Sequence, residues 1–101
     1  MIERTVENLK QYIGKYVLRE NREYKWMFKI VSVENCDRIQ VTQALDIFPK
    51  PRAYKQGIKG FRNVGLEDIG TRSEYTMRLP TKEEMNTYRQ FWRKIIYLGH
   101  L

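Results

Sequence analysis

Three strand-like runs, of which the second and third have apolar residues at alternate positions, constrain the fold of this chain more than any other feature. They cover about residues 15–19, 25–34 and 39–47, and short polar segments at 21–23 and 35–38 separate them. Alternation with a period of two predicts strands with one buried face, and turns of this length join antiparallel neighbours. We therefore predict an antiparallel meander. Pro49 and Pro51 should end it, because neither can donate a hydrogen bond to a ladder.

The second run contains an irregularity. Trp26, Phe28 and Ile30 alternate with polar or outward positions, but beyond Ile30 the inward position falls on Ser32. A β-bulge or a sharp bend near Ser32 would explain this slip. In the third run, Ile39, Val41, Leu45 and Ile47 are the expected inward residues, and Asp46 is expected outside.

Helices are predicted at both ends of the chain. Ile2, Val6, Leu9 and Ile13 are spaced as one face of a helix over about 3–13, and Gly14 suits the position after it, where φ is often positive. A last strand is predicted from the alternation of Tyr75, Met77 and Leu79, and Pro80 ends it. Thr81 and Glu84 then form a capping box for a helix over about 82–97. Its buried face should be Met85, Tyr88, Trp92 and Ile95, with Phe91 beside it.

These elements predict one α+β domain over residues 1–101. At 101 residues the chain can bury a single modest core. The expected architecture is a curled antiparallel sheet of four to five strands with an N-terminal and a C-terminal helix. Its sharper version is a small SH3-like or OB-like barrel.

The charge distribution indicates the kind of partner. The chain has 19 Lys and Arg against 12 Asp and Glu, a net charge of +7. Five of the basic residues fall in the segment 49–63, which has two aromatic residues, two glycines and no acidic residue. The candidate binding residues in this segment are Lys50, Arg52, Tyr54, Lys55, Lys59, Phe61 and Arg62. Lysine and arginine neutralise phosphates, and aromatic rings can stack on bases.

A second basic surface is predicted on the C-terminal helix. Lys82, Asn86, Arg89 and Arg93 are spaced along one face opposite the apolar residues, with Lys94 beside them. Arg89 and Arg93 therefore join the candidate site. The alternative is that this ridge is only the solvated face of an amphipathic helix. The segment 49–63 has the alternative of a plain connection, or of a further strand around 53–58.

Metal and cofactor sites are not expected. Cys36 and His100 are the only soft ligands, so no zinc spacing exists. With a single cysteine and no apolar stretch of signal-peptide or membrane-spanning length, we expect a cytoplasmic protein without an internal disulfide and without a membrane partner.

Two features of the sequence resemble known protein families. Gly57-Ile58-Lys59-Gly60 matches the GXXG loop of KH domains, but that loop joins two helices, whereas strands precede this one. In composition, Arg52, Tyr54, Lys55, Lys59 and Arg62 resemble the Lys, Arg and Tyr of small RelE-like toxin ribonucleases. That family places two helices before its main strands, which this chain does not.

The leading hypothesis is therefore a non-catalytic binding module for DNA or RNA, which uses the segment 49–63 and the helical ridge. The alternative is a small regulator or inhibitor that docks its basic face on an acidic groove of a larger, nucleic-acid-handling protein. Compact modules of this kind are common among phage-encoded host-takeover and anti-defence proteins. A RelE-like ribonuclease is the minor alternative.

Overall fold

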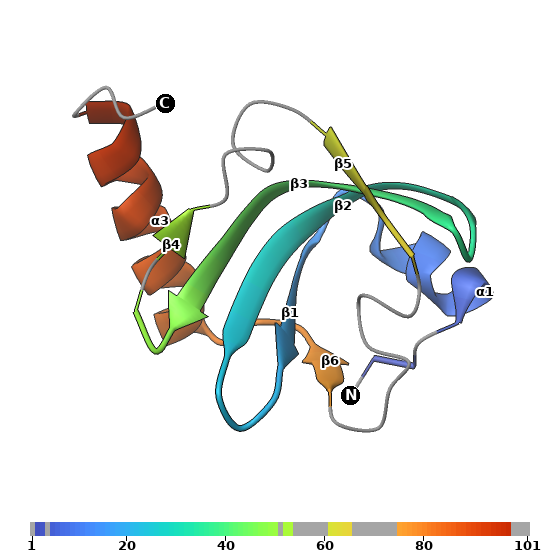
Figure 1. Cartoon of the computed structure of the whole chain (residues 1–101), viewed down its shortest axis with the longest axis horizontal. Helices are drawn as coiled ribbons and strands as arrows, with labels where there is room; N and C mark the ends of the chain where they lie inside the picture. Colours follow the sequence, from blue (N-terminus) through green and yellow to red (C-terminus); the bar gives the residue numbers. More distant parts are fainter. Residues whose placement is uncertain (1, 4, 51, 54–60, 66–74, 98–101) are drawn as a thin grey trace.

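The computed structural model describes residues 2–3, 5–50, 52–53, 61–65 and 75–97, with the backbone alone at 52–53, 61–62 and 95–97. Within these ranges six strands form one curled antiparallel sheet (Figure 1). The strands are β1 (Tyr16–Glu20), β2 (Lys25–Asn35), β3 (Arg38–Phe48), β4 (Arg52–Ala53), β5 (Phe61–Val64) and β6 (Thr76–Arg78). The helical segments are α1 (Val6–Leu9), the 3₁₀ turn η1 (Lys10–Tyr12) and α3 (Lys82–Tyr97).

The strand order is β4-β3-β2-β1-β6, and β5 also pairs with β3. β5 pairs with the first half of β3, from Ile39 to Thr42, whereas β4 pairs with the second half at Leu45 and Asp46. Six strands thus occupy five positions, since β4 and β5 share one edge. The predicted α+β class, the curled antiparallel sheet and the two terminal helices are confirmed. The strand β5 was not predicted, and β4 begins one residue before the predicted 53–58 strand, the rest of which lies outside the described residues.

β3 changes face at Gln43. Met27 pairs with Leu45 and Lys29 with Thr42, so β3 has one residue more than β2 between these pairs. Gln43 has a φ of 55°, a left-handed conformation that is uncommon outside glycine and typical of a bulge. The extra residue sends Leu45 and Ile47 to the opposite face from Ile39 and Val41. The prediction that all four point inward, with Asp46 outside, was therefore wrong, and Asp46 is buried.

Both faces of the sheet are consequently covered. The cluster on the α1 side contains Ile2, Leu9, Val17, Trp26, Phe28, Ile30, Val33, Ile39, Val41, Ala44, Val64 and Met77. The cluster on the α3 side contains Leu18, Met27, Leu45, Ile47 and Tyr88. In Figure 1, α1 lies under the arc of the strands and α3 lies outside it.

The N-terminal helix is shorter than predicted. Thr5 caps it by accepting a hydrogen bond from the Asn8 amide, 3.1 Å away, and Ile2 lies before the helix, where its amide donates to the Met77 carbonyl. The last turn is 3₁₀, which rotates the chain further per residue than an α-turn. Tyr12 therefore packs on the core, and Ile13, predicted to be buried, is 45% exposed. Gly14 has the predicted positive φ, 85°.

The predicted irregularity in β2 is present. Ile30 pairs with Val41 and Ser32 with Gln40, which leaves one extra residue in β2 and returns Val33 to the cluster of Ile30. The two predicted turns are also present, with the side-chain oxygens of Asn21 and Asn35 accepting backbone amides. Leu79 was predicted to point inward with Met77, but it lies just beyond β6 and is 51% exposed.

Candidate nucleic-acid interface

The start of α3 is fixed by the predicted capping box. The Glu84 amide donates to Oγ1 of Thr81 over 3.2 Å, and Oε1 of Glu84 accepts from the Thr81 amide over 2.8 Å. These bonds satisfy two of the amides that a helix start leaves without partners. The helix then runs to Tyr97 as predicted.

The side chain of Tyr88 orients α3 on the sheet. Tyr88 is buried, and its hydroxyl donates to the Gln43 carbonyl oxygen over 2.6 Å. Its ring meets Tyr16 edge-on at 5.3 Å and Trp92 at 6.0 Å, centroid to centroid. Met85, Phe91 and Trp92 are partly buried beside it. The predicted packing face is confirmed except at Ile95, whose side chain lies outside the described part.

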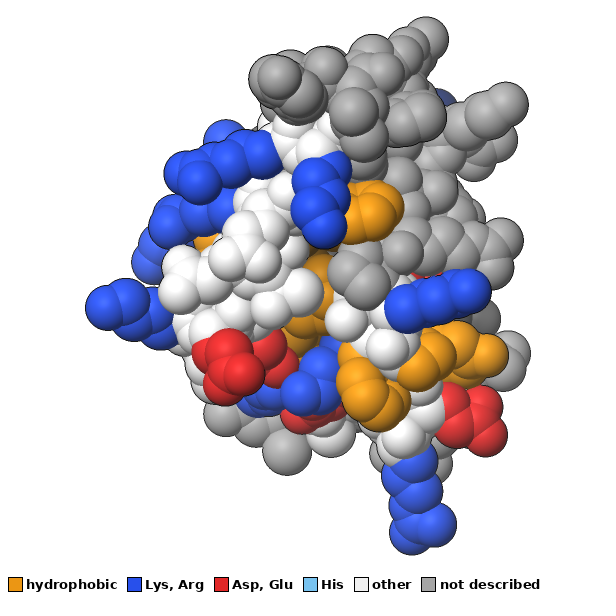
Figure 2. All heavy atoms as spheres, turned by 90° about the vertical axis from the view of Figure 1, so that its left-hand side faces the viewer, with side chains coloured by type: hydrophobic (Ala, Val, Ile, Leu, Met, Phe, Trp, Pro, Cys, Tyr) orange, Lys and Arg blue, Asp and Glu red, His pale blue; other side chains and the backbone are white. Residues whose placement is uncertain are grey.

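The opposite face of α3 is open and basic. Lys82, Asn86, Arg89, Gln90, Arg93 and Lys94 are all exposed, and no acidic residue occurs between positions 85 and 97. The ion pairs formed within the described residues do not include Arg89, Arg93 or Lys94. Figure 2 shows Lys and Arg side chains spread over the face from which α3 is seen, with the acidic ones mainly in its lower half.

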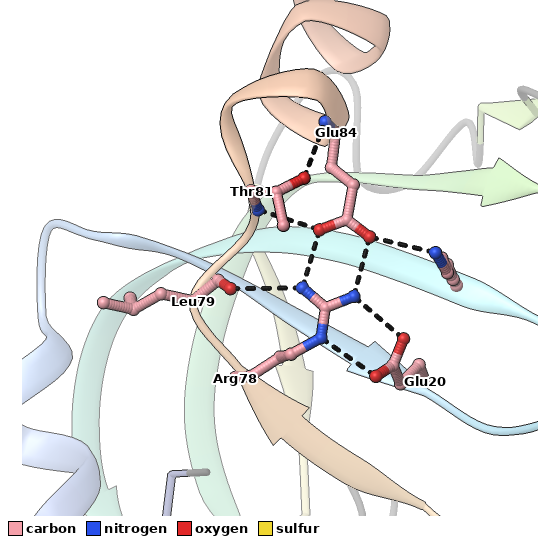
Figure 3. A network of polar contacts seen from close by, with 6 residues as sticks. Glu20, Arg78, Leu79, Thr81 and Glu84 are labelled. Carbon is pink, nitrogen blue, oxygen red and sulfur yellow. Dashed lines mark hydrogen bonds and ion pairs between the residues drawn. The ribbon is translucent and has the colours of Figure 1, made fainter.

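A network of charged side chains holds the first turn of α3 to the sheet (Figure 3). Arg78 on β6 donates to both oxygens of Glu20 on β1, at 2.9 and 3.0 Å, and to both oxygens of Glu84, at 2.6 and 2.7 Å. Nζ of Lys25 on β2 donates to Glu84 over 3.1 Å. Sequence reasoning identified Glu84 as a cap, but it missed Glu20, Lys25 and Arg78, because such pairs join positions up to 59 residues apart.

This network is electrostatically satisfied. Hydrogen bonds from Arg78, with smaller contributions from Thr81 and Lys25, lower the pKa of Glu84 from 4.5 to about 2 against the opposing effect of burial. Hydrogen bonds to Glu84 and Glu20 raise the pKa of Arg78 above its ordinary value. Glu84 therefore stays ionised at neutral pH and has no proton to donate as a general acid. The network fastens the first turn of α3 to β1, β2 and β6.

A pocket of about 410 Å³ lies beside the network. Its walls include Lys25, Phe48, Thr81, Glu83 and Thr87. Phe48 is 45% exposed, and Nζ of Lys25 lies 5.9 Å from its ring centroid. The pocket mixes both signs of charge, and the first turn of α3 forms one side of it.

The predicted residues of the segment 49–63 are described only in part. Lys50 is exposed just after β3. The backbone of Arg52 belongs to β4, and the backbones of Phe61 and Arg62 belong to β5. Tyr54, Lys55 and Lys59 lie outside the described residues, as does the GXXG motif at 57–60. Arg89 and Arg93 are exposed on α3, as predicted.

β3 lies next to both the α3 helix and the start of the basic segment 49–63. This proximity was not predicted from the sequence alone. Tyr88 of α3 packs against Leu45 and Ile47 of β3, and β4 pairs with the same part of β3 at Leu45 and Asp46. The start of the basic segment and the α3 helix therefore lie beside one stretch of one strand. β5 returns to the other half of β3, where Arg62 pairs with Val41.

Arg19 was not identified from the sequence as a notable residue. Its guanidinium lies 4.6 Å from the ring centroid of Trp26 and 4.5 Å from that of Tyr75. These distances are typical of cation–π interactions. Trp26 and Tyr75 were predicted as core residues, and their rings also contact the charged guanidinium of Arg19. Pairing of Arg19 with Trp26 across β1 and β2 is what brings the two together.

Comparison of the chain with protein-family models, curated proteins and solved structures finds no match. Among the described residues, no helix is long and apolar enough to cross a membrane. The same residues contain no cluster of three His, Cys, Asp or Glu side chains suited to a metal ion.

Proposed function

We propose that this protein is a non-catalytic nucleic-acid-binding module that contacts phosphate backbones with the exposed face of α3 and with the basic segment 49–63. The observation that carries the proposal is the α3 face itself. Arg89 and Arg93 are exposed, one turn apart, and engaged in no ion pair within the described residues. Surface arginines without an ion-pair partner in the described part of the structure, on a chain of net charge +7, favour a polyanionic partner.

The position of Lys50 and β4 supports a continuous surface. Both lie at the end of β3 against which α3 packs, so the start of the basic segment and α3 lie beside the same stretch of the sheet. The charged network at the base of α3 holds this helix in a fixed orientation, which limits the ordering cost of binding. The single cysteine, Cys36, is compatible with action in the cytoplasm, which we also propose.

The test is a salt series with generic single-stranded and duplex DNA and RNA. If phosphates are the target, log affinity should fall linearly with log salt concentration, by about 0.9 per phosphate neutralised. The double variant Arg89→Gln/Arg93→Gln should weaken binding to all sequences and reduce the slope by up to about two.

Lys10→Gln is the matched control. Lys10 is exposed on η1, which packs on the other face of the sheet from α3, so its loss should change the slope much less. Absence of binding at low salt, or an equal effect of Lys10→Gln, would contradict the proposal. Recovery of one dominant acidic protein partner would favour the regulator hypothesis, and cleavage of the RNA probe would favour a ribonuclease.

A further inference from the structure

The exposed face of α3 carries more than positive charge. Asn86, Arg89, Gln90 and Arg93 follow one another at i, i+3, i+4 and i+7, and all four are exposed. This spacing places them on one side of a helix, turned away from the buried Tyr88. Arginine binds the O6 and N7 acceptors of guanine in bidentate fashion, and asparagine and glutamine bind N6 and N7 of adenine. A face that only solvates a helix does not require this set of side chains.

The dimensions of α3 fit one kind of groove. A helix with its side chains is about 10–12 Å across, and the B-form major groove is about 12 Å wide. From Asn86 to Arg93 the axial rise is about 10 Å at 1.5 Å per residue, which equals about three base-pair steps of 3.4 Å. Lys82 and Lys94 lie on either side of this stretch in the sequence and are also exposed, where phosphates would flank a bound groove.

In the C-terminal half of α3, Gln90, Arg93 and Lys94 are exposed. Figure 1 shows α3 at one side of the molecule, with its C-terminal turns farther from the strands than its first turns. Among the side chains that the structure describes, the apolar contacts of α3 with the sheet come from Met85, Tyr88, Phe91 and Trp92. The first turn of α3 is thus anchored to the sheet by the Arg78–Glu84 network. The exposed residues Asn86, Arg89, Gln90 and Arg93 follow this anchored turn along the helix.

We propose that α3 is a recognition helix that enters the major groove of duplex DNA and reads base edges with Asn86, Arg89, Gln90 and Arg93. This inference rests on the proposed nucleic-acid function and narrows it to B-form duplex. A-form RNA is disfavoured because its major groove is too deep and narrow for side chains to read. Single strands are disfavoured because none of the four side chains is an aromatic platform for stacking.

The experiment is selection of duplex DNA with a randomised central segment, followed by affinity measurements on the selected duplex, a scrambled duplex and the matching single strand. The wild type should enrich a short motif and bind the selected duplex at least about 10-fold more tightly than the scrambled one, as bidentate base contacts allow. Asn86→Ala and Gln90→Ala should each reduce this ratio several-fold, while affinity for the scrambled duplex and the salt slope stay nearly unchanged, since neither residue is charged.

Gln11→Ala is the control for the amide substitutions. Gln11 is exposed on η1, away from α3, and its loss should leave the ratio unchanged. Alanine favours helix formation, so the α3 variants should fold, and circular dichroism verifies this. Duplex binding without any enriched motif, or with a ratio insensitive to Asn86→Ala and Gln90→Ala, would overturn base reading and leave backbone binding intact. Failure to bind any nucleic acid would instead overturn the proposed function itself.

Discussion

The hydroxyl of Tyr88 on α3 donates a 2.6 Å hydrogen bond to the backbone carbonyl oxygen of Gln43, the residue at which β3 changes face. The Tyr16 hydroxyl donates to the side-chain oxygen of the same glutamine, also at 2.6 Å. Tyr16 of β1 and Tyr88 of α3 therefore both hold the bulge in place. The bond from Tyr88 also fixes the position of the basic helix relative to the bulge.

Tyr88→Phe should destabilise the fold. The substitution removes the donor and leaves the part-buried carbonyl of Gln43 without this partner, so the cost should lie toward the lower end of the range of about 1–3 kcal/mol. The midpoint of urea unfolding measures this loss. Tyr24→Phe is the matched control, because Tyr24 is 48% exposed and its change should stay within about 0.5 kcal/mol. Equal shifts for the two variants would show that the Gln43 bond contributes nothing.

At position 43, glycine should be better tolerated than alanine. Both substitutions remove the acceptor used by Tyr16, but only glycine adopts a φ of 55° without steric cost. We expect Gln43→Gly to be more stable than Gln43→Ala by up to about 1 kcal/mol in thermal unfolding. At Gln40, which pairs in continuous register with Asn63 of β5, the order should reverse by about 0.5–1 kcal/mol. The same order at both positions would contradict strain at Gln43.

The Glu84 network should give a defined pH dependence. The pKa of Glu84 is lowered from 4.5 to about 2 by its hydrogen bonds, so its stabilising effect is complete above pH 4.5 and is lost as the pH falls toward 2. Glu84→Gln should therefore be less stable than the wild type at neutral pH, by about 1–3 kcal/mol, and the difference should close in acid.

Glu83→Gln is the control for this pH series. Glu83 is exposed and belongs to none of the ion pairs formed by the described residues, so its substitution should cost less than about 1 kcal/mol. A stability gap for Glu84→Gln that persists unchanged at pH 2 would rule out the ionised carboxylate as its source.

Trp92→Ala tests the docking of α3. Trp92 packs against Tyr88 but is only partly buried. The loss of folding stability should therefore lie near or below the lower end of the range of about 3–5 kcal/mol for such truncations. Phe28→Ala, at a fully buried position, should fall within that range. A melting temperature unaffected by Trp92→Ala would mean that α3 does not depend on this contact.

Sequence patterns predicted the local features of this fold. The alternation of β2, the slip near Ser32, the capping box of Thr81 and Glu84 and the extent of α3 each depend on residues close together in the chain. The unpredicted features depend on residues far apart. Arg78 meets Glu20 across 58 positions, and the face change at Gln43 becomes visible only when β3 is paired with β2. β5 lacked a period-two pattern because its two apolar residues, Phe61 and Val64, are separated by two polar ones.

In the candidate site, too, the local features were predicted and the relation between distant segments was not. Exposure of Arg89 and Arg93 followed from helical periodicity, because their apolar neighbours determine which side packs. The relation of α3 to Lys50 and β4 needed the pairing of β4 with β3. Binding itself remains a prediction at every one of these residues.

Burial of both faces of β1, β2 and β3 restricts where new contacts can arise. Val17 and Leu18, neighbours in the chain, are both fully buried on opposite sides, so at these positions neither surface of the sheet is available as a platform. Most substitutions at these buried positions would destabilise the fold, so few of them could be retained and alter recognition. Changes in partner preference should therefore accumulate on the rim of the sheet and on the outer side of α3, where a residue can be exchanged without disturbing either core.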